Sequence, residues 1–155
     1  MMLRTHLAIV IFAILLFLSH ISSMSNKIIF VVIALIATLI PDLDTGFSTI
    51  GKMKGSKILR FFVRHRGFFH SFSFCIVVSV IFAFFIPILA LPFFLGYSLH
   101  LFADSFTFEG IKPFWPLRYS SSWRLRTGSL TETSLFVFFV VLDLIVFIFA
   151  IKGVF

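Results

Sequence analysis

The histidines and acidic residues of this chain are spaced in a way that predicts a metal site. Five histidines and six acidic residues occur among 155 positions. His100 and Asp104 are an i,i+4 pair, so on a helix both side chains project from one face and can share a metal ion. Asp42 and Asp44 are an i,i+2 pair, which in extended backbone places both carboxylates on one side. Imidazole together with carboxylate suits zinc, manganese or iron.

Further candidate ligands lie at the ends of apolar segments. His6 opens the first segment, and His65 and His70 flank the start of the third. Cys75, the single cysteine, lies in an apolar stretch, so neither a cysteine metal cluster nor a disulfide is available. Seven candidates could hold either one ion or two adjacent ions. The predicted metal ligands are His6, Asp42, Asp44, His65, His70, His100 and Asp104.

The composition indicates that a membrane surrounds these residues. Apolar residues make up 60% of the chain, charged residues make up only 12%, and 25 positions are phenylalanine, which excludes a soluble domain. We therefore expect an all-α fold, a polytopic membrane helix bundle of four or five transmembrane helices in a single domain over residues 1–155. Several apolar runs are shorter than the roughly 20 residues that a span normally needs. The runs cover residues 6–21, 27–40, 68–86, 88–106 and 134–151.

Prolines and one capping motif predict where these helices begin and end. Pro41 is expected to end the second run, because the residue before a proline disfavours helical backbone. Pro87 and Pro92 bracket the turn between the third and fourth runs. The motif Ser129-Leu-Thr-Glu132 is typical of a capping box and predicts a C-terminal helix over residues 132–151.

The basic residues predict the orientation of the bundle. If the chain crosses the bilayer with each run, only Lys27 and Lys152 among the 13 lysines and arginines lie on one side, and all the others lie on the side of the candidate ligands. By the positive-inside rule the N-terminus and the metal site are cytoplasmic. The net charge of +7 then reflects topology, and no nucleic acid partner is expected.

Three other residues have side chains that could serve a site of this kind. Arg66, between His65 and His70, could hold a phosphate or carboxylate in bidentate fashion beside the metal, or could be an ordinary topology-setting charge. Asp143 lies in the middle of the last run, where an acid is either functional or hydrogen-bonded to a neighbouring helix. His20 lies on the opposite side. We place Asp143 and His20 outside the site.

The spacing of the motifs resembles the YdjM-like family, over about residues 5–117. The family is described as LexA-binding, inner-membrane-associated hydrolases, and many members are labelled metal-dependent hydrolases. The resemblance implies a helical inner-membrane protein with a divalent-metal site built from the seven ligands above. The matching motifs are Thr5-His6, Pro41-Asp-Leu-Asp44, His65-Arg-Gly-Phe-Phe-His70-Ser71, Gly96-Tyr-Ser-Leu-His100-Leu-Phe-Ala-Asp104 and Trp115-Pro116.

The first hypothesis is therefore a metal-dependent hydrolase at the cytoplasmic membrane face. The metal, zinc before manganese or iron, would lower the pKa of a bound water, and Asp42 or Asp44 would accept the proton, with Arg66 near the substrate. A site at head-group depth favours an ester or phosphoester, such as a phospholipid or a lipid-linked substrate. The alternatives are a metal-binding or transport protein without hydrolysis, and a regulatory protein that binds a partner through its basic loops. The sequence does not fix the oligomeric state.

Overall fold

The structure, a computed structural model, describes residues 1–155 except 19, 22, 51–67, 118 and 153–155. The described residues form five α-helices and no strand. This result confirms the predicted all-α fold. The helices are α1 (Leu3–Leu18), α2 (Met24–Ile50), α4 (Phe72–Phe85), α5 (Pro87–Ser105) and α6 (Leu130–Ile151).

Three of the described helices are long and apolar enough to cross a membrane. The qualifying segments are Ser25–Asp42 in α2, Pro87–Ser105 in α5 and Leu130–Ile151 in α6. The shorter apolar helices α1 and α4 have 16 and 14 residues, so they are about 24 and 21 Å long at 1.5 Å per residue, less than the roughly 30 Å of a hydrocarbon core. The protein is thus a helical membrane bundle with helices of unequal length.

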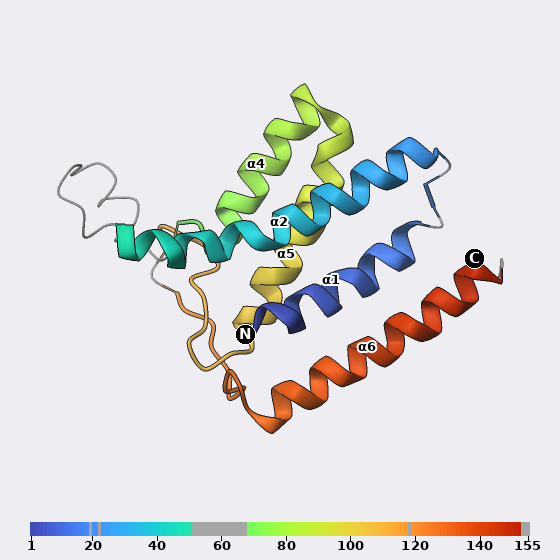
Figure 1. Ribbon diagram of the computed structural model, residues 1–155. Helices are drawn as coiled ribbons and strands as arrows, with labels where there is room; N and C mark the ends of the chain where they lie inside the picture. The colour runs from blue at the N-terminus through green and yellow to red at the C-terminus, as the bar shows by residue number, and fades with distance from the viewer. Residues whose placement is uncertain (19, 22, 51–67, 118, 153–155) are drawn as a thin grey trace.

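The helix order gathers five chain segments at one end of the bundle. The start of α1 lies beside the end of α5, and α6 lies alongside α1 with the C-terminus at the opposite end (Figure 1). Helix α2 runs back along α1, and α4 and α5 form a hairpin. The end of α2 and the start of α4 therefore lie at the same end of the bundle. Ile86 lies between α4 and α5 and caps both helices. Pro87 is the first residue of α5, where a backbone N–H would have no partner within the helix, so proline is well tolerated there.

The prediction that Pro41 ends the second helix is wrong. Helix α2 continues through Pro41 as far as Ile50, and it changes direction along its length (Figure 1), as is usual for a helix with an internal proline. Pro41 is fully buried. In a membrane bundle neighbouring helices compensate for the hydrogen bond that proline removes, so the local preference of the residue before proline is overridden.

Helices α2 and α5 pack so closely that the backbone of one contacts the backbone of the other. A Cβ atom added to Gly96 would lie 2.1 Å from the carbonyl oxygen of Ala34. The hydroxyl of Thr38 donates to the carbonyl of Ala34 at 2.8 Å and also reaches that of Gly96 at 3.4 Å. Small residues and cross-helix hydroxyls are the usual means by which membrane helices approach closely. This contact sets the distance between the two helices that carry Asp42, His100 and Asp104.

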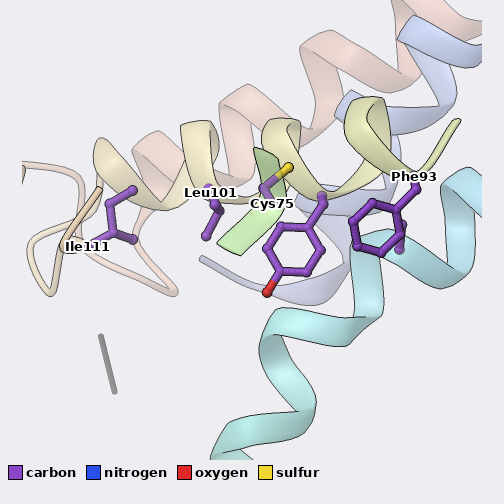
Figure 2. Packing of buried hydrophobic residues seen from close by; sticks show 6 residues of the cluster. Cys75, Phe93, Leu101 and Ile111 are labelled. Atoms are coloured by element: carbon purple, nitrogen blue, oxygen red, sulfur yellow. The ribbon is translucent and has the colours of Figure 1, made fainter. Parts of the chain in front are cut away.

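The buried apolar side chains form two clusters. One joins α2, α4, α5 and the connection that follows α5, and Figure 2 shows its members Cys75, Phe93, Leu101 and Ile111. The other joins α1 and α2 around Val10. Helix α6 is different, since only 6% of it is buried. Most of its large apolar side chains are exposed, as expected for a helix that faces lipid.

The capping motif is present at the start of α6. Ser129 precedes the helix in extended backbone, and its hydroxyl accepts a hydrogen bond from the backbone N–H of Glu132 at 3.3 Å. The helix begins at Leu130, two residues before the predicted start. The Glu132 side chain turns elsewhere, as described below.

Gly96→Ala should separate α2 from α5, because the added methyl group would overlap the backbone of Ala34. Overpacking of this kind costs about 1–3 kcal/mol, so we expect a lower melting temperature for the detergent-solubilised protein. Ser98→Ala is the matched control, since among the described residues its hydroxyl bonds to Leu95 of its own helix and to no other helix. Equal melting temperatures for both variants and the wild type would contradict the proposed role of the Gly96 contact.

Candidate metal centre

Helix α5 contributes two buried groups to the candidate site. His100 and Asp104 lie in the last two turns of α5, and both are buried. The Nε2 atom of His100 lies 3.4 Å from Oδ2 of Asp104. The i,i+4 spacing therefore places both side chains together on one helix face, as the sequence indicated.

Helix α2 brings Asp42 to the same place. Its Oδ1 atom lies 3.7 Å from Nε2 of His100. The side chain of Asp42 is 37% exposed, whereas that of Asp104 is 13% exposed. Of the two carboxylates, Asp42 is thus the one with more access to water.

The segment before α4 supplies His70. Its ring centroid lies 6.0 Å from that of His100. Ser71 caps α4 immediately after His70, with its hydroxyl accepting from the N–H of Phe74. The hydroxyl of Tyr97 donates to the carbonyl of Phe69. These bonds fix the backbone on both sides of the imidazole.

Four of the predicted ligands come together in space. One potential ligand atom from each of Asp42, His70, His100 and Asp104 lies within 4.8 Å of the others. Three of the four residues are buried. These residues come from three separate segments of the chain and could hold a metal ion.

His6 lies directly beside this group. It is 1% exposed, its Nε2 atom is 3.1 Å from Oδ1 of Asp104, and its ring stacks on that of His100 at 4.0 Å between centroids. The α-amino group of Met1 also contacts Oδ1 of Asp104, at 2.7 Å. The carboxylate of Asp104 is therefore the point at which α1 and α5 meet.

The chemistry of these residues fits a divalent metal ion. Among the described residues, the Nε2 atom of His100 lies 3.4 Å from Asp104 and 3.7 Å from Asp42, is buried and makes no hydrogen bond. A buried polar atom without a partner costs about 1–3 kcal/mol. Imidazole nitrogens and carboxylate oxygens are ligands that zinc, manganese and iron accept. Binding of a cation would also offset the charge of the two grouped carboxylates.

Three of the predicted site residues are not placed by the structure. His65 and Arg66 lie outside the described residues, and so does the side chain of Asp44. The backbone of Asp44 is helical, so the argument that an extended backbone pairs it with Asp42 is wrong. His20 follows the far end of α1, and Asp143 lies 11 residues beyond Glu132 in α6, about 16 Å along the helix.

Glu132 is a residue near the site that the sequence analysis missed. It is fully buried at the start of α6. One carboxylate oxygen accepts hydrogen bonds from the N–H of Met2 at 2.5 Å and the hydroxyl of Thr5 at 3.3 Å, and the other accepts from the N–H of Gly128 at 2.5 Å. The sequence analysis assigned Glu132 only to the capping motif of its own helix. Its role toward α1 could have been inferred only from the fact that both helices begin at the same end.

The connection between α5 and α6 covers the site. The carbonyl of Pro113 accepts from the N–H of Phe72 at 2.8 Å, and the Trp115 ring packs edge to face on Phe68 with centroids 5.0 Å apart. A cavity of about 370 Å³ lies between this connection and the candidate ligands Asp42, His70 and Asp104. The grouped residues are therefore open to a ligand from one side.

Comparison with known proteins identifies a family. A family model described as YdjM inner membrane protein matches residues 1–154, which is nearly the whole chain. No curated protein and no solved structure matches the chain.

Replacing the central ligands should remove bound metal. His100→Ala and Asp104→Ala each delete a buried member of the group, so we expect a metal content well below that of the wild type by elemental mass spectrometry. His20→Ala is the control, because His20 lies at the other end of α1. Equal metal content in the three variants would rule out the assignment.

Loss of the Glu132 carboxylate should loosen the start of α1. Glu132→Ala leaves the donors of Met2, Thr5 and Gly128 without their acceptor, at a cost of about 1–3 kcal/mol. We expect a lower melting temperature and weaker metal retention through displacement of His6. Glu132→Gln keeps one acceptor oxygen and should lie between the wild type and the alanine variant. A Glu132→Ala protein with wild-type stability would contradict this account.

Proposed function

Because the chain belongs to the YdjM inner membrane protein family, we propose that it is a membrane-bound hydrolase that uses a divalent metal ion. The observation that carries the proposal is the group of Asp42, His70, His100 and Asp104, which is mostly buried and yet adjoins a cavity. A structural ion would need no such opening. Catalytic metal sites characteristically keep access for water and substrate.

The ion would be held by this group, with His6 alongside, and zinc suits the donors best, followed by manganese and iron. When bound, a divalent ion polarises the scissile group and makes a neighbouring water more acidic. Asp104 also contacts His6 and His100, so besides being a ligand it would hold these imidazoles in place. Asp42 is more exposed, and we assign to it acceptance of the proton from the attacking water.

The place of the site in the bundle supports an amphiphilic substrate. The ligands lie at the end of α5, at the start of α1 and at Asp42, the last residue of the apolar segment of α2, which corresponds to the head-group level of a membrane. The excess of basic residues at this end favours the cytoplasmic face of the cell's inner membrane, with several passes through it. An ester or phosphoester, free or lipid-linked, would reach such a site.

The proposal is tested by hydrolysis in lipid nanodiscs. We expect the wild type to release product from at least one member of a panel of carboxylic esters, phosphomonoesters and phospholipids. A chelator should abolish turnover and added zinc should restore it. Asp42→Asn should lower kcat about a hundredfold or more, as is typical when a general base is lost, and His20→Ala should leave kcat unchanged.

Two outcomes would contradict the hydrolase. Turnover that persists in His100→Ala would come from another protein in the preparation. Stoichiometric metal without turnover of any panel member would indicate metal binding or transport instead.

A further inference from the structure

The cavity beside the metal centre has a floor and a rim of different chemistry. Its floor is formed by the candidate ligands Asp42, His70 and Asp104, and its rim comes from the connection between α5 and α6. Eight of its eleven lining residues have polar side chains. The rim residues with polar side chains and access to water are Glu109, Lys112, Ser120 and Thr127.

The rim is held in a defined conformation. Ile111 and Ser121 exchange two backbone hydrogen bonds of 2.9 Å, which join the two arms of the connection. The Thr107 hydroxyl donates to the carbonyl of Asp104 at 2.7 Å, so the connection is tied to the end of α5. Gly110 has a φ of 64°, and a Cβ atom there would lie 2.4 Å from the carbonyl oxygen of Ser121. The side chain of Ile111 is 5% exposed, which anchors the residue before Lys112 in the core.

Lys112 gives this cavity a cationic contact above the metal ligands. It is the only lysine or arginine among the described residues that line the cavity. Its side chain is exposed, and within the described part of the chain no carboxylate forms an ion pair with it. Glu109 adds one negative charge to the rim, so the rim is not a general basic patch. The ammonium group acts as one point of attraction for an anion.

The size of the cavity limits what it can hold. A volume of about 370 Å³ lies at the small end of the range for small-molecule pockets, about 300–1,000 Å³. A phosphate group with a small substituent fits this space, but a pair of acyl chains does not. The bound portion of a substrate is therefore small and hydrated.

From these observations we infer that Lys112, with the hydroxyls of Ser120 and Thr127, forms a subsite for the phosphate group of the substrate. The inference deepens the proposed function and rests on it. A phosphate bound there would lie between the ammonium group on the rim and the metal ligands on the floor. A phospholipid head group and a soluble phosphate monoester share this chemistry.

The test measures binding of inorganic phosphate by calorimetry, so it does not depend on turnover. Metal-loaded protein in nanodiscs of neutral phosphatidylcholine is compared as wild type, Lys112→Met, Lys112→Arg and Lys152→Met. Loss of a charge-assisted hydrogen bond should weaken binding about tenfold in Lys112→Met, whereas Lys112→Arg should stay within about threefold of the wild type. Lys152→Met is the matched control, because this exposed lysine lies at the other end of α6.

The outcomes separate this inference from the hydrolase proposal. Equal phosphate affinity in Lys112→Met and the wild type, or no phosphate binding to metal-loaded wild type, overturns the subsite. Weakened binding in Lys112→Met with unchanged metal content supports it, even if no panel substrate is hydrolysed. Competition by vesicles containing phosphatidic acid would identify a lipid head group as the source, and competition only by glycerol phosphate would identify a soluble ester.

Discussion

A carboxylate buried at the end of an apolar helix bundle is stable only when cationic or hydrogen-bonding groups surround it. Asp104 is such a group, and His6, His100 and the α-amino group of Met1 all reach it. These partners come from α1 and α5, which are about a hundred residues apart in the chain. Satisfying this one carboxylate therefore requires that the two helices meet at their polar ends. Asp42 and His70 then lie beside a position that the contact between α1 and α5 defines.

The same logic explains why a second acid, Glu132, matters although it is not in the ligand group. Its carboxylate takes hydrogen bonds from Met2 and Thr5, and His6 follows Thr5 directly. Helix α6 is otherwise nearly all exposed apolar surface and packs only along α1 within the described bundle. The helix that faces lipid thus positions an imidazole at the site through hydrogen bonds at its first turn. Burial of apolar area alone would not define that position, because lipid is as apolar as the helices.

The sequence predicted the features that depend on the local spacing of residues and on the number and order of apolar runs. The helical pair His100 and Asp104, the membrane bundle and the convergence of ligands at one end follow from periodicity and from alternate crossing of the bilayer. The course of α2 through Pro41 could not be predicted, because Pro41 is fully buried and tertiary packing overrides the local preference of the chain. The bonds of Glu132 to α1 depend equally on tertiary contacts. Asp44 was paired with Asp42 on the assumption of an extended backbone, and the helical backbone observed there removes the reason for that pairing.

A site built in this way combines two environments that a membrane protein seldom brings together. The ligands His70, His100 and Asp104 are buried, so an ion among them would interact strongly with its surroundings. Asp42 and the rim formed by the connection after α5 are open to water. An amphiphilic molecule could leave its chains in the bilayer while its hydrated group entered the cavity. Because the polar cavity adjoins the ends of lipid-facing helices, such a substrate would not have to leave the membrane.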